Sequence, residues 1–311
     1  QQKGLLPRVA HQAFTSKTSK GEVEFAAGSV IIPLAYQPLS ASEVHASLQA
    51  VSNEVGIKIH AITDGFSVKG IDLGSNNVKV VKKPRVALVS GGNWTSFGEV
   101  WALLSQTYGL PVVKLNGENS SRFDLNRYSS IILTGDKYDA EFAARLAQWV
   151  ENGGTLISLN ASNAWVNKVV FAARKPVGTA EKEGATLAPG ASREGRLTGV
   201  IVKAELNEKS PLSFGLNNKA SYALKTNAAG IDSLSAETVV LKSSDILVNG
   251  FVDSSAQAKL KPSIVVASAS KGRGGVVYFS ESPTFRGYWL STSRLLVNAV
   301  FFGANNGMRR F

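Results

Sequence analysis

The stretch Arg85-Val86-Ala87-Leu88-Val89-Ser90-Gly91-Gly92 determines the fold that we expect for this chain. It is a short run of apolar and β-branched residues ending in two glycines, which is typical of a strand buried on both faces of a parallel sheet. Residues 93–109 follow with apolar side chains at helical spacing, and Ser96 with Glu99 matches a capping box near the start. A buried strand that leads directly into a helix predicts an α/β fold.

The same alternation of short strands and amphipathic helices continues along the chain. We expect further strands at 111–115, 130–134, 155–159, 263–269 and 276–280, and helices at 139–150 and 290–302. A glycine-rich hairpin turn at 271–275 joins the last two strands. This order predicts a doubly wound, mainly parallel sheet covered by helices on both faces.

Two further regions flank or interrupt this α/β domain, which we place at 81–311. Residues 1–80 form an N-terminal α/β extension, in which Ser40 and Glu43 open a helix. We expect strands in this extension at 22–25, 29–34 and 57–62. Residues 170–260 form an irregular, β-rich insertion, with a long loop at 175–195 and strands at 200–206, 239–242 and 246–248.

Composition excludes several classes of protein. The 311 residues include no cysteine, so disulfide frameworks, cysteine-ligated metals and cysteine nucleophiles are absent. Only His11, His45 and His60 supply imidazoles, which leaves little scope for histidine-based metal or acid–base chemistry. No apolar run is long enough for a membrane span, and we expect no metal and no cofactor.

The net charge of +11 is unevenly distributed. Residues 171–311 carry 18 of the 34 basic side chains and 10 of the 23 acidic ones, whereas residues 84–170 are neutral. Nucleic-acid binding favours clustered basic residues interleaved with exposed aromatics, and the chain has no such run. We therefore expect a basic solvated surface and no nucleic-acid partner.

An ordered set of motifs spans residues 22–303. The set comprises Phe25-Ala26-Ala27-Gly28-Ser29-Val30-Ile31-Ile32-Pro33-Leu34 with Gln37-Pro38, Gly70-Ile71-Asp72-Leu73-Gly74-Ser75, Lys83-Pro84-Arg85-Val86-Ala87-Leu88, Gly153-Gly154-Thr155-Leu156, Ser210-Pro211-Leu212-Ser213-Phe214-Gly215, Gly272-Arg273-Gly274-Gly275-Val276-Val277-Tyr278-Phe279 and Pro283-Thr284-Phe285-Arg286-Gly287 with Asn298-Ala299. Together these motifs resemble the C-terminal part of bacterial M14-type zinc carboxypeptidases. In that part, a class I glutamine amidotransferase-like domain, which is flavodoxin-like in fold, follows the peptidase domain.

The resemblance implies an exported bacterial protein, periplasmic or extracellular. The first residues, Gln1-Gln2-Lys3-Gly4, include no initiator Met and no apolar signal core, so we expect the chain to start inside a longer precursor or after a removed leader. The zinc motif of the peptidase domain is His-x-x-Glu with a distant histidine. His11, His45 and His60 are followed at the third position by Phe14, Leu48 and Thr63, so no zinc residue is carried over. The implied partner is the peptidase domain of the same precursor.

A working class I amidotransferase needs a cysteine on a strand-to-helix elbow, together with a histidine base and an acid. Ser162, in the turn after the strand at 155–159, is the only candidate replacement for that cysteine. Its partner would be Asp136 or Glu281. No histidine follows it in the sequence, so glutamine hydrolysis is close to excluded.

Ligands of open α/β sheets bind beyond the carboxyl ends of the strands. This rule nominates a set of polar and glycine residues that follow the strands: Asn93, Trp94, Gly135, Asp136, Asn160, Ser162, Glu281 and Arg286. In one interpretation they form a small polar pocket, with Arg286 as an anion anchor. In the other, they serve only the turns in which they lie, because turns favour these residue types.

We expect a non-catalytic accessory domain that packs on or modulates the peptidase domain, or that binds peptide or cell-wall material. One alternative is a hydrolase that uses Ser162, and another is a small-ligand or carbohydrate-binding module. A hydrolase requires Ser162 on a strained elbow beside an acidic or basic partner, and a binding module requires a concave pocket with exposed Trp94 or Trp289. An accessory domain requires an exposed apolar patch on the N-terminal segment, where the partner would lie.

Overall fold

The computed structural model describes residues 1–171, 197, 199–216, 221–226, 231 and 238–303. The chain divides into two compact units, Gln1–Lys83 and Pro84–Phe311. The loop expected at 175–195 lies outside the described residues. Each unit is described by itself.

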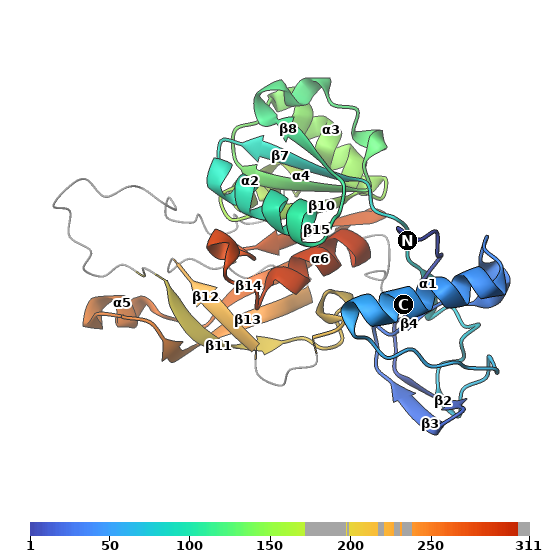
Figure 1. Ribbon diagram of the computed structural model, residues 1–311. Helices are drawn as coiled ribbons and strands as arrows, with labels where there is room; N and C mark the ends of the chain where they lie inside the picture. The colour runs from blue at the N-terminus through green and yellow to red at the C-terminus, as the bar shows by residue number, and fades with distance from the viewer. Residues whose placement is uncertain (172–196, 198, 217–220, 227–230, 232–237, 304–311) are drawn as a thin grey trace. The chain divides into compact units, whose positions relative to one another are not determined.

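A nine-stranded sheet forms the centre of the second unit (Figure 1), with the strand order β12-β11-β13-β14-β15-β10-β9-β7-β8. The strands are β7 (Val86–Gly91), β8 (Val112–Asn116), β9 (Ser130–Gly135), β10 (Thr155–Leu159), β11 (Val200–Leu206), β12 (Ser221–Lys225), β13 (Thr238–Asn249), β14 (Ser263–Lys271) and β15 (Gly274–Phe279).

Five neighbouring strands, β8-β7-β9-β10-β15, pair in parallel. Counted along the chain, their spatial order is 2-1-3-4-5, which is the flavodoxin-like order of doubly wound sheets. The parallel core predicted from the sequence is therefore confirmed. The other four strands, β14, β13, β11 and β12, extend the sheet with antiparallel pairings, so the expected insertion adds strands to the same sheet.

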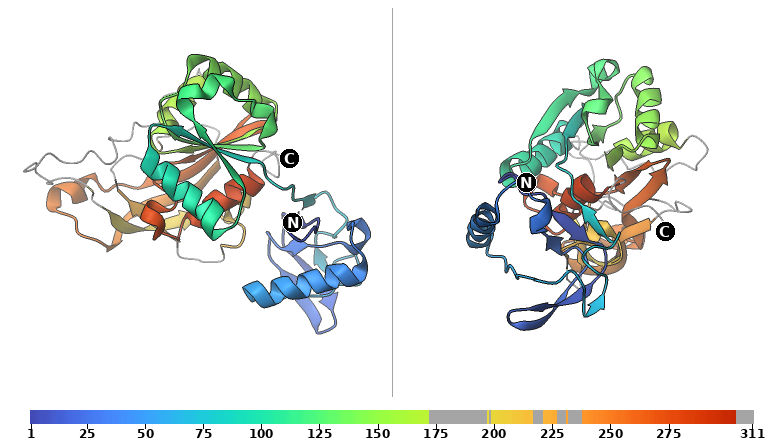
Figure 2. Two further views of the ribbon diagram at one scale, coloured as in Figure 1. Left: turned by 45° about the horizontal axis from the view of Figure 1, so that its top comes forward. Right: turned by 90° about the vertical axis from the view of Figure 1, so that its right-hand side faces the viewer.

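Helices cover both faces of the parallel strands, as both views of Figure 2 show. Helices α2 (Trp94–Trp101) and α6 (Ser293–Phe302) lie on one face, and α3 (Ala140–Glu151) and α4 (Ser162–Val170) lie on the other. A further short helix, α5 (Ser254–Lys259), precedes β14.

Strand β7 illustrates why these residues form a central strand. All six of its residues are buried. Val86 and Leu88 belong to the apolar core beneath α2 and α6, whereas Ala87 and Val89 belong to the core beneath α3 and α4. Side chains alternate between the two faces of a strand, so a continuous apolar run buries both faces at once.

The start of α2 differs from the sequence-based expectation. Asn93 is the N-cap residue, and its side chain accepts a hydrogen bond from the Ser96 N–H. The carboxylate of Glu99 instead accepts hydrogen bonds from Ser282 Oγ and the Arg286 N–H. The predicted capping box of Ser96 and Glu99 is wrong, because Asn93 caps the helix one turn earlier and the loop after β15 binds Glu99. The helix continues as the π-helical segment η2 (Ala102–Thr107).

Strand β13 corrects a second expectation. The two strands predicted at 239–242 and 246–248 are one continuous strand, Thr238–Asn249, that pairs with β11 along much of its length. Register shifts accompany the pairing on both sides of β13. These irregularities allow the strand to pass through the polar residues 243–245 without ending.

The first unit has two three-stranded sheets, β4-β1-β6 and β3-β2-β5, and one long helix. Their elements are β1 (Arg8–Ala10), β2 (Phe14–Thr18), β3 (Gly21–Phe25), β4 (Val30–Ile31), β5 (Lys69–Gly70), β6 (Val78–Val80) and α1 (Ala41–Val55). Ser40 and Glu43 form the predicted capping box at the start of α1.

Two predicted strands of the first unit are wrong in whole or in part. Residues 57–62, although described, form no strand, and Ile57 and Ile59 are exposed with no neighbouring strand to pair with. The strand expected at 29–34 ends at Ile31, because Pro33 has no N–H to donate and begins the 3₁₀ turn η1 (Leu34–Tyr36).

Among the helices of the described residues, none is both long enough and apolar enough to cross a membrane.

Gly135 tests the close contact between the ends of β7 and β9. Its φ is +144°, and a Cβ atom placed on it would lie 2.3 Å from the Gly91 carbonyl oxygen. We expect Gly135→Ala to lower the free energy of unfolding by about 3 kcal/mol, because both the backbone conformation and the contact become strained. Urea denaturation of the whole chain measures this change.

Gly98→Ala is the matched control, since Gly98 lies within α2 and a Cβ placed on it would meet nothing within 4 Å. We expect this control to raise the free energy of unfolding by up to about 1 kcal/mol. Equal effects of the two substitutions would contradict the close contact at Gly135.

Candidate functional site

The carboxyl ends of β7, β9, β10 and β15 lie side by side at one edge of the sheet. Every candidate site residue follows one of these four strands, except Gly135, which is the last residue of β9. Open α/β sheets bind ligands beyond this edge, and most often where the strand order reverses, which here is between β7 and β9. The contacts at this edge therefore determine what it is able to bind or do.

The crevice between β7 and β9 is closed by backbone contacts. The Gly91 carbonyl oxygen accepts hydrogen bonds from the N–H groups of Asp136 and Lys137, and the Asn93 N–H donates to Thr134 O. The ring of Tyr138 packs on Gly91, where a Cβ would lie 2.5 Å from Tyr138 Oη. Burial raises the pKa of the Tyr138 hydroxyl, so this group remains neutral. Gly135 and Asp136 thus lie where a ligand of this fold would enter, but their backbone closes the crevice.

Asn160 occupies the strand-to-helix elbow after β10. Its φ is +49°, the left-handed conformation that a residue other than glycine rarely adopts. The Asn160 N–H donates to Phe279 O, and its carbonyl oxygen accepts from the Asn163 N–H. In hydrolases with such an elbow, the strained residue of the turn carries the nucleophile. The expectation that Ser162 holds this position is therefore wrong, since Asn160 does.

Ser162 is instead the first residue of α4 and is fully buried. Its Oγ accepts a hydrogen bond of 2.8 Å from the Gly135 N–H, which links the start of α4 to the end of β9. Neither of its expected partners is bonded to it: Asp136 is exposed, and Glu281 is bound elsewhere. Among the described residues, Ser162 therefore has neither of the carboxylates expected beside it, and its hydroxyl links α4 to β9.

The side chain of Asn160 is buried but has no hydrogen-bond partner. Only 4% of Asn160 is exposed, and both Oδ1 and Nδ2 lack a partner among the described residues. The neighbouring Asn163 is equally buried and fully used, because its Oδ1 accepts from Ser158 Oγ and its Nδ2 donates to Phe279 O. An unpaired buried amide costs about 1–3 kcal/mol, so the elbow carries both backbone strain and an unmet hydrogen-bonding capacity.

Substitutions at Asn160 and Asn163 should change the free energy of unfolding in opposite directions if the Asn160 amide is unpaired and the Asn163 amide is bonded. We expect Asn160→Gly to raise the free energy of unfolding by about 1 kcal/mol, because glycine adopts positive φ without strain and leaves no orphaned amide. Asn163→Ala should lower it by about 2 kcal/mol, since the buried Ser158 hydroxyl loses its acceptor. Thermal or urea unfolding measures both, and a destabilising Asn160→Gly would contradict the unpaired state of the Asn160 amide.

Glu281 follows β15 and forms a buried ion pair. Its Oε1 lies 3.1 Å from Lys225 Nζ on β12, and its Oε2 accepts hydrogen bonds from the Thr226 N–H and Oγ1. Lys225 Nζ also donates to Ser263 Oγ on β14. Burial raises the pKa of the Glu281 carboxyl, while Lys225 and Thr226 act in the opposite direction. The pair fastens the outermost strand β12 to the loop after β15.

Replacing one member of this ion pair should lower the free energy of unfolding more than replacing both. We expect Lys225→Met or Glu281→Leu alone to lower the free energy of unfolding by about 3–5 kcal/mol, because each leaves a buried charged group without its partner. The double variant should recover most of that loss. Urea unfolding of the wild type, the two single variants and the double variant gives the coupling free energy between the two side chains. Losses of unfolding free energy that simply add in the double variant would contradict the ion pair.

Asn93, Trp94 and Arg286 complete the predicted set. Asn93 serves as the cap of α2, whereas Trp94 beside it is 61% exposed. Arg286 is exposed and has a φ of +52°, held by the hydrogen bond from its N–H to Glu99. Its guanidinium lies over the ring of Phe285, 5.0 Å from the ring centre, and its charge remains available at this edge.

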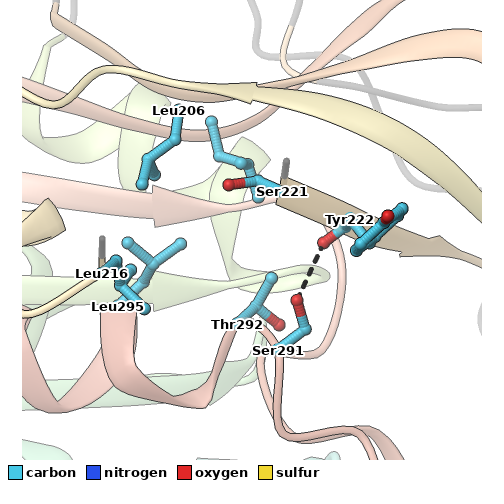
Figure 3. A pocket seen from close by; sticks show the side chains of 8 residues that line it. Leu206, Leu216, Ser221, Tyr222, Ser291, Thr292 and Leu295 are labelled. Carbon is cyan, nitrogen blue, oxygen red and sulfur yellow. Dashed lines mark hydrogen bonds between the residues drawn. The ribbon is translucent and has the colours of Figure 1, made fainter. Parts of the chain in front are cut away.

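A separate apolar cleft of about 90 Å³ lies between β12 and the start of α6 (Figure 3). Its walls combine leucines with hydroxyl residues: Leu206, Leu216, Leu241, Leu295, Ser221, Ser291, Thr292 and Tyr222. Ser291 Oγ donates to the Tyr222 carbonyl oxygen across one end, as the dashed line shows. No predicted site residue lines this cleft.

Within the described part of the chain, no group of three or more His, Cys, Asp or Glu side chains is placed to hold a metal ion.

Comparisons with known proteins bear on the fold. No protein-family model and no curated protein matches the sequence. A putative ThuA-like protein from Parabacteroides merdae is similar in structure, with a TM-score of 0.50 and 14% identity over 74% of this chain and 93% of that one. A cytoplasmic protein from Salmonella typhimurium matches with a TM-score of 0.43 and 14% identity, over 70% of this chain and 98% of that one.

A β-galactosidase from Bacillus circulans sp. alkalophilus matches with a TM-score of 0.43 and 13% identity, over 71% of this chain and 31% of that one. The ThuA-like similarity supports a class I glutamine amidotransferase-like, flavodoxin-like α/β fold, as the motifs imply. At 14% identity it shows the fold alone.

The sequence placed the candidate residues at the carboxyl edge of the sheet, where the structure has them. It did not predict two side chains that bind groups at this edge, Lys225 and Glu99. Lys225 lies on the short strand β12, which has no strong apolar run that would predict a strand, and it is 56 residues from its partner Glu281 in the sequence. Glu99 was assigned to a helix cap. The signal for Asn160 was present, because asparagine is the residue after glycine that best tolerates positive φ, and it directly follows the strand.

Proposed function

We propose that this chain is a non-catalytic accessory and binding domain of an exported zinc carboxypeptidase-like protein. The observation that supports a non-catalytic role is the residue at the elbow after β10. Asn160 is at the strained position, and an amide is not a nucleophile at neutral pH. The hydroxyl of Ser162 accepts a hydrogen bond from the Gly135 N–H. The second unit, from Pro84 onward, contains no cysteine that could act as the nucleophile and no histidine that could act as the base.

The first unit supports the accessory half. Ten of its large apolar side chains are exposed: Leu6, Val30, Leu34, Tyr36, Val55, Ile57, Ile59, Phe66, Val68 and Val80. Its core cluster is small, with Ala10, Phe14, Ile71 and Val78 as its buried members, and Leu5, Val9 and Val44 are the other buried apolar residues. So much exposed apolar surface on a small unit favours packing against another protein surface. A peptidase domain in the same precursor, as the motif resemblance implies, is the partner we propose.

Turnover assays test the non-catalytic half. The purified chain is incubated with glutamine, p-nitrophenyl acetate and a short peptide, beside the Ser162→Ala variant and a protein-free blank. We expect all three rates to be equal for every substrate, because no base is placed to activate Ser162. Turnover by the wild type that disappears in Ser162→Ala would establish the hydrolase alternative.

The accessory half is tested by the coding sequence upstream of the Gln1 codon. We expect it to encode a His-x-x-Glu motif with a distant third histidine, which are the ligands of a carboxypeptidase zinc ion. An upstream sequence without such a region would remove the proposed partner and leave only a binding domain.

A further inference from the structure

The cleft between β12 and the start of α6 is open to solvent but apolar at its base (Figure 3). Leu241 and Leu295 at the base are each 1% exposed. Leu206 and Leu216 in its walls are partly exposed, and Ser291 at its rim is exposed. Solvent thus reaches an apolar concave surface. Such a surface favours an apolar occupant, because binding removes both from water.

The volume of the cleft limits the size of that occupant. An apolar cavity of about 150 Å³ holds benzene, so about six carbon atoms need this volume. By the same measure, the cleft, at about 90 Å³, has room for about four carbon atoms. An isobutyl group has this number of carbon atoms and a compact, branched shape. A rigid aromatic ring is too large for the cleft.

The serine and threonine hydroxyls of the cleft differ in the hydrogen bonds that they have left to make. Thr292 Oγ1 is already engaged both as an acceptor and as a donor. Ser291 Oγ donates its proton to the Tyr222 carbonyl oxygen. Ser221 Oγ has no hydrogen-bond partner among the described residues. Ser221 is therefore free to donate to an acceptor oxygen on the occupant.

Arg294 adds a positive charge beside the cleft. It lies on α6 next to Leu295, and its guanidinium packs on Gly215, where a Cβ atom would lie 2.8 Å from Nη2. Gly215 directly precedes Leu216 of the cleft wall, so the guanidinium lies at the rim. Arg294 is exposed, and no described carboxylate forms an ion pair with it. Its charge is therefore available to an anion at this rim.

We propose that this cleft binds a short, branched aliphatic carboxylate. The branched end occupies the space among the four leucines, and the carboxylate oxygens accept hydrogen bonds from the Arg294 guanidinium and Ser221 Oγ. The charge-assisted bond to Arg294 sets the preference for an acid. This inference rests on the proposed function as a binding domain and names the chemical class of its ligand. A free fatty acid and the C-terminal leucine of a peptide share this chemistry.

Titration of the whole chain with small molecules tests this class of ligand. The probe is 4-methylpentanoate, in which a methylene joins an isobutyl group to a carboxylate. We expect it to bind, as calorimetry or NMR shifts measure, and 4-methylpentanamide to bind about tenfold more weakly, because a hydrogen bond to a charged group is worth more than a neutral one. Acetate, which lacks the branched end, should not bind measurably. Added salt should weaken binding of the acid and leave that of the amide unchanged.

N-acetyl-leucine distinguishes the two sources of this ligand. It places the same isobutyl group beside a carboxylate and an amide, as the end of a peptide does. Binding at least as tight as that of 4-methylpentanoate would identify a peptide end, and weaker binding would identify a free fatty acid.

Two variants with matched controls locate the site. Ser221→Leu fills the cleft with a side chain the size of the ligand's branched end, and should abolish binding of 4-methylpentanoate to the folded protein. Arg294→Gln should weaken binding about tenfold and remove its salt dependence. Ser255→Leu in α5 and Arg127→Gln before β9 make the same exchanges at exposed positions that do not line the cleft, and should bind as the wild type does. Urea unfolding confirms that each variant is folded.

Three results would overturn the inference: no binding of 4-methylpentanoate to the folded wild type, equal binding of the acid and the amide, or unchanged binding to Ser221→Leu. None of them bears on turnover or on the coding sequence upstream of Gln1, which test the proposed function. Turnover that depends on Ser162 would contradict the non-catalytic function and leave the cleft in place, so the two failures are distinguishable.

Discussion

The hydrogen bond from the Gly135 N–H to Ser162 Oγ determines what the carboxyl edge of this sheet is able to do. It fastens the first residue of α4 to the end of β9, and Gly135 in turn lies against Gly91 at the end of β7. The ends of β7 and β9 and the start of α4 are thereby held together. Ser162, the serine that its place in the sequence nominates as a nucleophile, contributes its hydroxyl to this contact.

This arrangement explains why Asn160, and not Ser162, is the residue of interest. The elbow fixes one residue at positive φ, and asparagine tolerates that conformation better than most other residues with a side chain. Asn163, three residues later, shows what a purely structural buried asparagine looks like at this place, with both ends of its amide bonded. Within a single turn, one buried amide is therefore bonded at both ends and the other is bonded at neither among the described residues.

The sequence was sufficient to predict the parallel core because each central strand is an apolar run buried on both faces. Such a run can be recognised as a strand from its own residues alone. The turns were harder. Asn93 and Ser96 are both good helix caps, and the choice between them depends on Glu99 being drawn to a loop almost 190 residues away. The two-residue error at the elbow has another origin, because the end of the strand at Leu159 was predicted correctly and the positive φ falls on the very next residue, Asn160.

Long-range polar pairing limited the rest of the prediction. Lys225 and Glu281 are compatible with an exposed surface when each is considered alone, and only the folded chain brings them together in the interior. The expectation for the first unit's apolar side chains needed less information, because a small unit cannot bury all of them. Its exposed apolar residues fit a domain that has a partner.

Labelling with a fluorophosphonate probe tests the central claim most directly, because such probes react covalently with activated serines. Intact-mass measurement of the folded chain after prolonged exposure should show no adduct, since the hydroxyl of Ser162 is buried and bonded to the Gly135 N–H. A stoichiometric adduct that maps to Ser162 would contradict the account, and would show that this serine is an accessible nucleophile in the folded protein.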